Sequence, residues 1–304
     1  MSTHVIVGAG AVGSSTARHL AERGDQVKLV TRSGSGPEHP AIERIALDAT
    51  DADRLSAVVD GAAALYNCAN PQYHQWFRDW PPLHAALLAS AERTGATLVS
   101  ASCLYMYGPV SAPMTPSTPM AATHPKLRLR GEMWSETLAL HEAGRIHAVE
   151  VRGSDYIEAQ SILSYALGKP LLDGARGWVP APLDVPHSWT SVHDMARTLA
   201  TVSTEPTAWG RVWHAPTNEA HTIRELAVMF ADANGAPAPK VSEIPFPVMW
   251  AYGLFDPMVR ELRTTRYQFT RPFILDSSAT QTELGLAPTP LMDALRTAGA
   301  ALRG

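Results

Sequence analysis

Cysteine is scarce in this sequence, with only two residues among 304. Two thiols cannot build a disulfide framework or a four-ligand zinc cluster, so small secreted scaffolds and zinc modules are excluded and no metal site is expected. Charged residues make up only 18% of the chain, and the formal net charge is −4. Such a balance argues against nucleic acid as a partner.

Long apolar runs are also missing, and none approaches the length that crosses a bilayer. The first apolar segment begins at Thr3, so we expect no signal peptide, no membrane partner and a cytoplasmic location. The 45% of hydrophobic residues are enough for a globular core. A length of 304 residues suits one large α/β domain, alone or with a smaller lobe.

Residues 3–33 predict a strand, a glycine turn, a helix and a second strand. Residues 3–7 are apolar and β-branched, and the turn that follows has the spacing G-x-G-x-x-G at Gly8, Gly10 and Gly13. These glycines allow a tight turn, a close backbone approach to a pyrophosphate and close packing of the helix on the sheet. The free amides and dipole of the helix favour a bound phosphate. We therefore predict a dinucleotide site that includes Ala11 and Val12, rather than a turn with only a structural role.

The end of the second predicted strand bears on which dinucleotide binds. An NAD site usually has Asp or Glu there to bond the adenosine ribose, whereas this strand ends at Thr31, Arg32 and Ser33. Arg32 can pair with a 2′-phosphate, and the two hydroxyls can donate to it. The sequence therefore favours NADP over NAD, unless Arg32 is only a solvated surface charge.

Further strands are predicted at residues 42–47, 62–68, 97–102 and 146–151, with helices between them. This alternation predicts a parallel, doubly wound α/β sheet of the Rossmann type. The pattern changes after residue 151, and Thr222 with Glu225 forms a capping-box pattern before a helix over 222–233. We expect residues 1–155, with about 184–218, to form the NADP-binding domain. Residues 156–183 and 219–304 are expected to form a smaller substrate-binding lobe.

The motifs VGAGAVG, LDATD, LVSASCLYMYG, HSWTSVHDMART and DSSATQTELGLAP follow one another along nearly the whole chain. In this order they resemble the atypical or extended short-chain dehydrogenase/reductase superfamily, in its NAD(P)-dependent epimerase/dehydratase-like group. The resemblance implies a cofactor along the strand ends and a C-terminal substrate lobe. It also implies a catalytic Ser or Thr after the fifth strand, and a Tyr-x-x-x-Lys pair on the next helix that transfers a proton and holds the nicotinamide ribose.

The sequence departs from this pattern at the catalytic end. The position of the catalytic hydroxyl falls on Cys103, and no Tyr-x-x-x-Lys is present. The nearest spacing matches are His124-x-x-x-Arg128 and Lys126-x-x-x-Arg130. Four residues are candidates to fill the catalytic role, each with an alternative as a packed or solvated side chain: Cys103, Tyr105, His124 and Lys126. Tyr73 can also project over the nicotinamide.

The remaining site predictions follow from the strand ends. Asp48 can accept from the adenine amino group or cap the next helix, two alternatives that we weigh equally. The other expected cofactor-binding residues are Ala49, Cys68, Ala69, Asn70, Ser102, Lys126, Gly153 and Ser154. The expected substrate side consists of Tyr73, Trp76, Asp155, Tyr156, His187 and Trp189. Cys68 and Cys103 end neighbouring strands, which places two thiols near the cofactor cleft. They are either small buried residues or, if one thiol is exposed, candidates for a redox or nucleophilic role.

Together these observations predict an NADP-dependent oxidoreductase or epimerase/dehydratase-like enzyme that acts on a small molecule by hydride transfer at the nicotinamide. The missing tyrosine keeps two alternatives open. One is a cofactor-assisted, non-redox isomerase or cyclase of a biosynthetic pathway, and the other is a catalytically silent NADP sensor. We expect a monomer or a homodimer.

Overall fold

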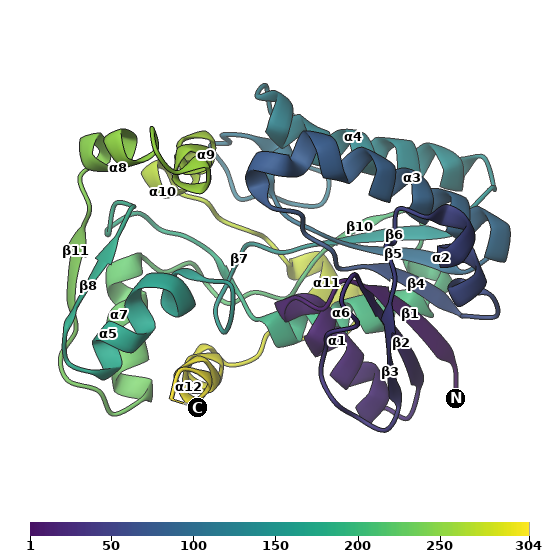
Figure 1. The fold of residues 1–304 in the computed structure, drawn as a ribbon. Helices are drawn as coiled ribbons and strands as arrows, with labels where there is room; N and C mark the ends of the chain where they lie inside the picture. The colour runs from purple at the N-terminus through teal and green to yellow at the C-terminus, as the bar shows by residue number, and fades with distance from the viewer. Residues whose placement is uncertain (304) are drawn as a thin grey trace.

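A computed structural model describes residues 1–303, and its centre is a seven-stranded parallel sheet (Figure 1). The strand order is β10-β6-β5-β4-β1-β2-β3. The strands are β1 (Thr3–Val7), β2 (Gln26–Thr31), β3 (Ile42–Ala46), β4 (Ala64–Asn67), β5 (Thr97–Ser102), β6 (Ala148–Arg152) and β10 (Val212–His214). The predicted doubly wound Rossmann sheet is therefore confirmed.

Helices cover both faces of the sheet, as Figure 1 shows. Val5 and Val7 of β1 pack into one core cluster, while Ile6 between them packs into another. This alternation follows from the two-residue period of a strand, whose successive side chains point to opposite faces. The first cluster contains residues of α2 (Ala52–Val59), α3 (Trp76–Thr94) and α4 (Pro125–Glu142), and the second contains residues of α1 (Ala11–Glu22) and α6 (Val192–Ser203).

Helix α3 is continuous from its first turn, although the sequence predicts a helix mainly after Pro82. Pro81 and Pro82 remove two backbone donors, which disfavours a helix locally. Trp76 and Trp80, one turn apart at the start of the helix, are almost completely buried in the core, and the indole of Trp76 donates to the carbonyl of Pro71 at 2.9 Å. Tertiary packing therefore overrides the local preference in this segment.

A second cluster of elements lies away from the main sheet (Figure 1, left). Strands β8 (Arg176–Val179) and β11 (Lys240–Glu243) pair in parallel. A separate core forms between α7 (Ile223–Ala233), α12 (Leu291–Ala301) and α5 (Gly168–Leu172), the last of which continues a π-helical turn over Leu163–Leu167. The predicted capping box of Thr222 and Glu225 is present at the start of α7.

Several short elements lie between these two parts or beside them. They are β7 (Asp155–Tyr156), β9 (Trp189–Thr190), α8 (Phe246–Tyr252), α9 (Pro257–Thr265), α10 (Tyr267–Thr270) and α11 (Ser278–Glu283). Thr280 of α11 donates to the carbonyl of His214 in β10 at 2.7 Å, so this late segment contacts the main sheet. The domain boundaries given above stay a prediction.

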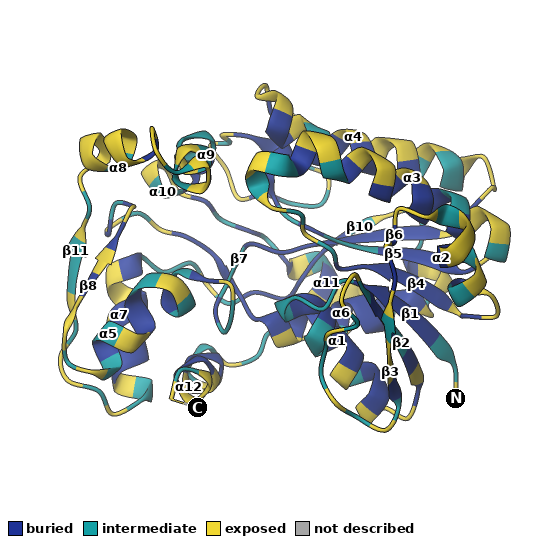
Figure 2. Ribbon diagram, viewed as in Figure 1, coloured by how far each residue is buried: buried dark blue, intermediate teal, exposed yellow. Residues whose placement is uncertain are grey.

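Helix α8 is exposed at nearly every position and is largely yellow in Figure 2. Among residues 1–303, no helix combines the length and the apolar character needed to cross a membrane.

Candidate functional site

The glycine turn after β1 is as tight as its spacing predicts. Gly8 has a φ of +100°, and a Cβ atom there would lie 2.7 Å from the backbone nitrogen of Ala69. A Cβ atom on Gly13 would lie 1.9 Å from the carbonyl oxygen of Gly8. Any side chain at Gly13 would therefore force the first turn of α1 away from β1.

Helix α1 begins in this turn with Gly10 as its N-cap, and no side chain among residues 1–303 bonds to the helix start. Its first turn carries no acidic residue. Free amides and the positive end of the helix dipole therefore face the carboxyl edge of the sheet. The shape and the charge of this turn both fit a phosphate group.

Arg32 lies exposed at the end of β2, beside a loop rich in hydroxyl groups. The Thr31 hydroxyl donates to the carbonyl of Ser35 at 3.2 Å, and the Ser33 hydroxyl donates to the Ser35 hydroxyl at 3.0 Å. No ion pair within residues 1–303 holds the Arg32 guanidinium. Its charge is available to a ligand.

Asp48 follows β3 and does not cap the next helix. Asp51 takes that role by accepting from the backbone of Arg54, which leaves Asp48 exposed at the strand end. Hydrogen bonds from the Thr50 backbone and hydroxyl lower the pKa of Asp48, and the Arg32 charge adds a smaller effect in the same direction. Asp48 is therefore a charged acceptor at the edge of the sheet.

The orientation of helix α4 distinguishes the two candidate pairs, His124 with Arg128 and Lys126 with Arg130. Lys126 and Arg130 are both buried, whereas His124 and Arg128 are exposed. The ring of His124 accepts from the backbone of Lys126 and caps the helix. Only Lys126 and Arg130, one turn apart, therefore point toward the sheet.

Arg130 reaches the end of β5. Its guanidinium donates to the carbonyl of Ala101 at 3.0 Å and to the hydroxyl of Ser102 at 3.2 Å, and it lies 4.2 Å from the ring centre of Trp80. The Lys126 ammonium donates to the carbonyl of Tyr73 at 2.7 Å and forms an ion pair with Glu261 of α9. The two positions of the motif thus carry two cations in place of a phenol and an ammonium.

Two tyrosines meet where β4 and β5 end. The hydroxyls of Tyr73 and Tyr105 form a short hydrogen bond, and Tyr73 packs on Trp76 with ring centres 4.8 Å apart. Burial raises the pKa of both phenols. The hydroxyl of Tyr267, from α10, is buried nearby with no hydrogen-bond partner among the described residues. The site therefore holds neutral phenols rather than a phenolate.

Asp155 and His187 form a second polar pair in this region. An oxygen of Asp155 lies 2.9 Å from Nε2 of His187, and Nδ1 of the same ring lies 3.3 Å from the carbonyl of Gln268. The geometry at Nε2 of His187 does not meet the angle of a hydrogen bond, so the two side chains are in close polar contact without a hydrogen bond between them. The imidazole stacks on Phe269 at 4.7 Å, which fixes the orientation of the pair.

Cys68 is buried, and Cys103 is half-buried. Burial raises the pKa of Cys68 to about 12, and it raises the pKa of Cys103 as well. Because the thiolate is the nucleophile, these shifts disfavour a reactive thiol at neutral pH. This supports the alternative in which both residues are small packed side chains.

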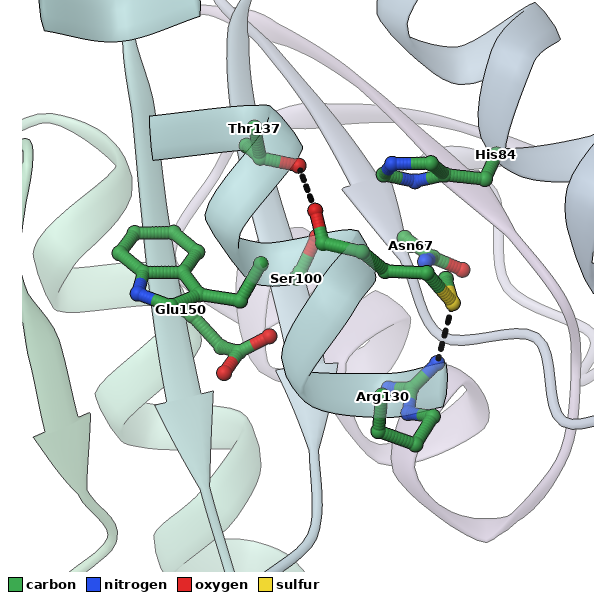
Figure 3. Close-up of a pocket in the computed structure, with 8 residues that line it drawn as sticks. Asn67, His84, Ser100, Arg130, Thr137 and Glu150 are labelled. Atoms are coloured by element: carbon green, nitrogen blue, oxygen red, sulfur yellow. Dashed lines mark hydrogen bonds between the residues drawn. The ribbon is translucent and has the colours of Figure 1, made fainter. Parts of the chain in front are cut away.

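Behind Arg130 lies a small polar cavity between the sheet and helices α3 and α4 (Figure 3). It has a volume of about 10 Å³, which is room for a single water molecule. Figure 3 shows Asn67, His84, Ser100, Arg130, Thr137 and Glu150 around it. The Oδ1 atom of Asn67 has no partner among the described residues, so a water there would satisfy it.

Comparison with solved structures identifies the fold. WbmH of Bordetella bronchiseptica, solved with NAD⁺, is 20% identical, with a TM-score of 0.75 over 100% of this chain and 98% of that one. A dTDP-glucose 4,6-dehydratase of Bacillus anthracis, solved with NAD, is 14% identical, with a TM-score of 0.79 over 100% and 97%. MoeE5, solved with UDP-glucuronic acid and NAD, is 18% identical, with a TM-score of 0.79 over 99% of both chains.

The chain has the fold of these solved structures, which confirms the predicted Rossmann-type architecture. At the sequence level, a family model described as FAD dependent oxidoreductase matches residues 3–39, which cover the glycine turn and its two strands. No curated protein sequence matches this chain significantly.

The structure gathers most of the predicted site residues at the carboxyl edge of the sheet. Gly153 donates to the carbonyl of Ser102 at 3.1 Å, and Ser154 donates to the hydroxyl of Thr190 at 3.0 Å, so the segment between β6 and β7 joins the end of β5 to β9. Sequence reasoning did not select Arg130 as a site residue, although its spacing from Lys126 was a usable signal.

Proposed function

We propose that this chain is an NAD(P)-dependent oxidoreductase or an epimerase/dehydratase-like enzyme that acts on a small molecule. The observation that carries the proposal is the glycine turn, in which Gly13 has no room for a Cβ atom and α1 begins without a side-chain cap. This turn opens on the same strand edge as Ser102, Cys103 and Asp155. Ligands of such sheets bind at that edge.

The residues present fit a dinucleotide along the strand ends. The turn amides would hold the pyrophosphate, Asp48 would accept from the adenine amino group, and Ala49, Ala69 and Asn70 would line the backbone path between them. Arg130, beside Ser102, would take the place of the lysine that holds the nicotinamide ribose in the implied pattern. When bound, the nicotinamide supplies hydride exchange with the substrate carbon.

Side chains of the protein would then donate hydrogen bonds and a proton to the substrate oxygen. Because burial raises their pKa values, Tyr73 and Tyr105 stay protonated at neutral pH. One of the two hydroxyls donates to the other, so the pair keeps one O–H that can donate to the substrate oxygen. Cys103 is a weaker donor than the usual hydroxyl. Lys126 would act on this tyrosine pair through the Tyr73 carbonyl, while His124 stays a prediction at the helix cap.

We favour NADP over NAD for this chain. The neighbouring structures contain NAD, so the preference depends on Arg32, Thr31 and Ser33. An exposed guanidinium without an ion-pair partner in the described chain, next to two hydroxyls and with no acid at the strand end, suits a 2′-phosphate.

The substrate side is rich in aromatic rings. Trp189 and Phe273 pack against the ring of His187 with centres 4.6 and 5.2 Å apart, and Tyr156 is adjacent to Asp155. His187, Trp189 and Phe273 are themselves buried, so they would support the wall of the site from behind, while the half-buried Asp155 carboxylate would fix a polar group of the substrate.

A catalytically silent dinucleotide sensor is the second candidate. It is favoured by the ion pair that neutralises Lys126 and by the raised pKa values of the nearby phenols. Both features oppose the usual proton transfer.

The test is to titrate the protein with NADPH and NADH and then to follow NADPH absorbance with a panel of small carbonyl compounds. Tight binding with oxidation supports the enzyme, and tight binding without oxidation of any compound supports the sensor. If neither dinucleotide binds, both readings are overturned.

A further inference from the structure

Gln160 lies outside the Rossmann sheet, yet its side chain faces the glycine turn. A Cβ atom placed on Gly10 would lie 3.5 Å from Oε1 of Gln160 and 3.7 Å from its Nε2. The residue is exposed, and its amide makes no hydrogen bond with any of residues 1–303. An amide with free donors therefore stands over the start of α1.

The backbone at Gln160 is in an unusual conformation. Its φ is +52°, and it is the one non-glycine residue of the described chain with a positive φ. This region of backbone conformation is unfavourable for a residue with a Cβ atom, so the surrounding structure must impose it. Residues held in this way often have a functional reason for their strain.

The turn that contains Gln160 is fixed on both sides. Before it, the carboxylate of Glu158 accepts from the hydroxyl of Ser191 and from the backbone of Val192 at 2.8 Å, at the start of α6. After it, the Ser161 hydroxyl donates to the carbonyl of Ile157 at 2.9 Å, and the Ser161 backbone donates to Ser164 at 2.8 Å. These hydrogen bonds hold the turn in place and so fix the position from which the Gln160 side chain extends.

We propose that the Gln160 amide is a ligand of the dinucleotide pyrophosphate, and that it closes the phosphate site from the side opposite the glycine turn. The proposal rests on the dinucleotide site proposed above. The amide can present its N–H groups by rotation about its last bond, and a hydrogen bond to a charged phosphate oxygen is stronger than one between neutral groups. The glycine turn supplies backbone donors from below, and Gln160 adds a side-chain donor from above.

The experiment uses the full chain in four forms: wild type, Gln160→Gly, Gln160→Glu and Gln26→Glu. Glycine removes the amide and accepts the backbone conformation, so the turn is kept. Glutamate keeps the size of the side chain and replaces the donor by a negative charge. Gln26→Glu makes the same charge change at the exposed, amino-terminal end of β2, away from the cleft.

Calorimetric titration with ADP-ribose and with adenosine separates the possibilities, because only ADP-ribose carries a pyrophosphate. Gln160→Gly should weaken ADP-ribose binding about tenfold, which is the effect of losing one hydrogen bond to a charged group. Gln160→Glu should weaken it further through charge repulsion. Adenosine binding should stay within about twofold in both variants, and Gln26→Glu should bind both compounds as the wild type does.

Two results would overturn the proposal while leaving the dinucleotide site intact. One is unchanged ADP-ribose affinity in Gln160→Glu, since a merely structural contact tolerates a side chain of equal size. The other is an equal loss of adenosine and ADP-ribose affinity in both Gln160 variants. If the wild type binds neither ADP-ribose nor NADPH, the dinucleotide site itself is overturned, and this inference falls with it.

Discussion

Glu261 of α9 forms an ion pair with Lys126 of α4, and the two side chains are 18% and 6% exposed. The contact joins the helical segment near the C-terminus to the helix that carries the expected catalytic motif. It also places a carboxylate next to the position where the implied pattern has its tyrosine.

Replacing only one partner of this ion pair should destabilise the protein more than replacing both partners with apolar residues. Glu261→Gln leaves a buried ammonium without its counter-charge, which should lower the free energy of unfolding by about 3 kcal/mol. The double variant Lys126→Met/Glu261→Met should cost less than Glu261→Gln. Urea denaturation measures both. Glu92→Gln, which breaks the exposed pair with Arg145, is the matched control and should cost far less than Glu261→Gln, because water screens an exposed pair. A double variant less stable than Glu261→Gln would contradict the expectation.

Arg32 should determine the choice between the two nicotinamide cofactors. Arg32→Ala removes the partner of the 2′-phosphate, so NADPH affinity should fall by about ten- to a hundredfold, while NADH affinity changes little. Fluorescence titration of both cofactors measures the ratio. Arg296→Ala on α12 removes the same charge far from the turn and should leave both affinities unchanged. Equal weakening of NADPH and NADH in Arg32→Ala would show that Arg32 does not read the phosphate.

Alanine substitutions at two positions of the glycine turn should differ in their effect: Gly13→Ala should impair both folding and dinucleotide binding, whereas Gly10→Ala should impair binding alone. Gly13→Ala forces a Cβ atom against the carbonyl of Gly8, so both thermal stability and dinucleotide binding should be lost or strongly reduced. Gly10→Ala meets only ordinary contacts, at 3.5 Å or more from Gln160. It should keep the melting temperature within a few degrees and weaken dinucleotide binding, because the methyl group lies where the phosphate approaches. Similar melting temperatures for the two variants would contradict this account.

Acid should destabilise the protein through His214. Burial lowers the pKa of this ring to about 4, while the unfolded chain titrates near 6.5. The unfolded state therefore binds more protons between these values, and stability is lost as the pH falls through this range. The Tyr107 hydroxyl lies 2.8 Å from Nε2, and Nδ1 lies 2.9 Å from the carbonyl of Asp276, which suits a neutral ring that accepts at one nitrogen and donates at the other.

The contribution of His214 should be about 2 kcal/mol between pH 7 and pH 5. Burial also lowers the pKa of His4 and His84, which act in the same direction. The test therefore compares the loss of unfolding free energy between the two pH values in wild type, His214→Asn and the exposed control His74→Gln. The loss should be smaller only in His214→Asn. An equal loss in all three proteins would assign the acid sensitivity to other groups.

The sequence predicted the cofactor end of this fold more completely than the catalytic end. Gly8, Gly10 and Gly13 act through backbone space, which depends on a few neighbouring residues and is therefore visible as a local spacing. The strand ends at Arg32 and Asp48 could be located for the same reason. Arg130 was harder to predict, because its role depends on which face of α4 is buried, and the charged start of that helix shows no clear apolar stripe. Gln160 and Glu261 could not be predicted, since each reaches the site from a segment distant in sequence.

The hydrogen bond between Tyr73 and Tyr105 has a consequence for spectroscopy and for inhibitor chemistry. Two neutral phenols in contact, each with a raised pKa, do not ionise together with exposed tyrosines in mild alkali. Reagents that modify phenolate, such as iodine or tetranitromethane, would therefore spare this pair in the folded protein and react first with the exposed ring of Tyr165. The two phenols therefore resist such reagents until the surrounding packing is disturbed.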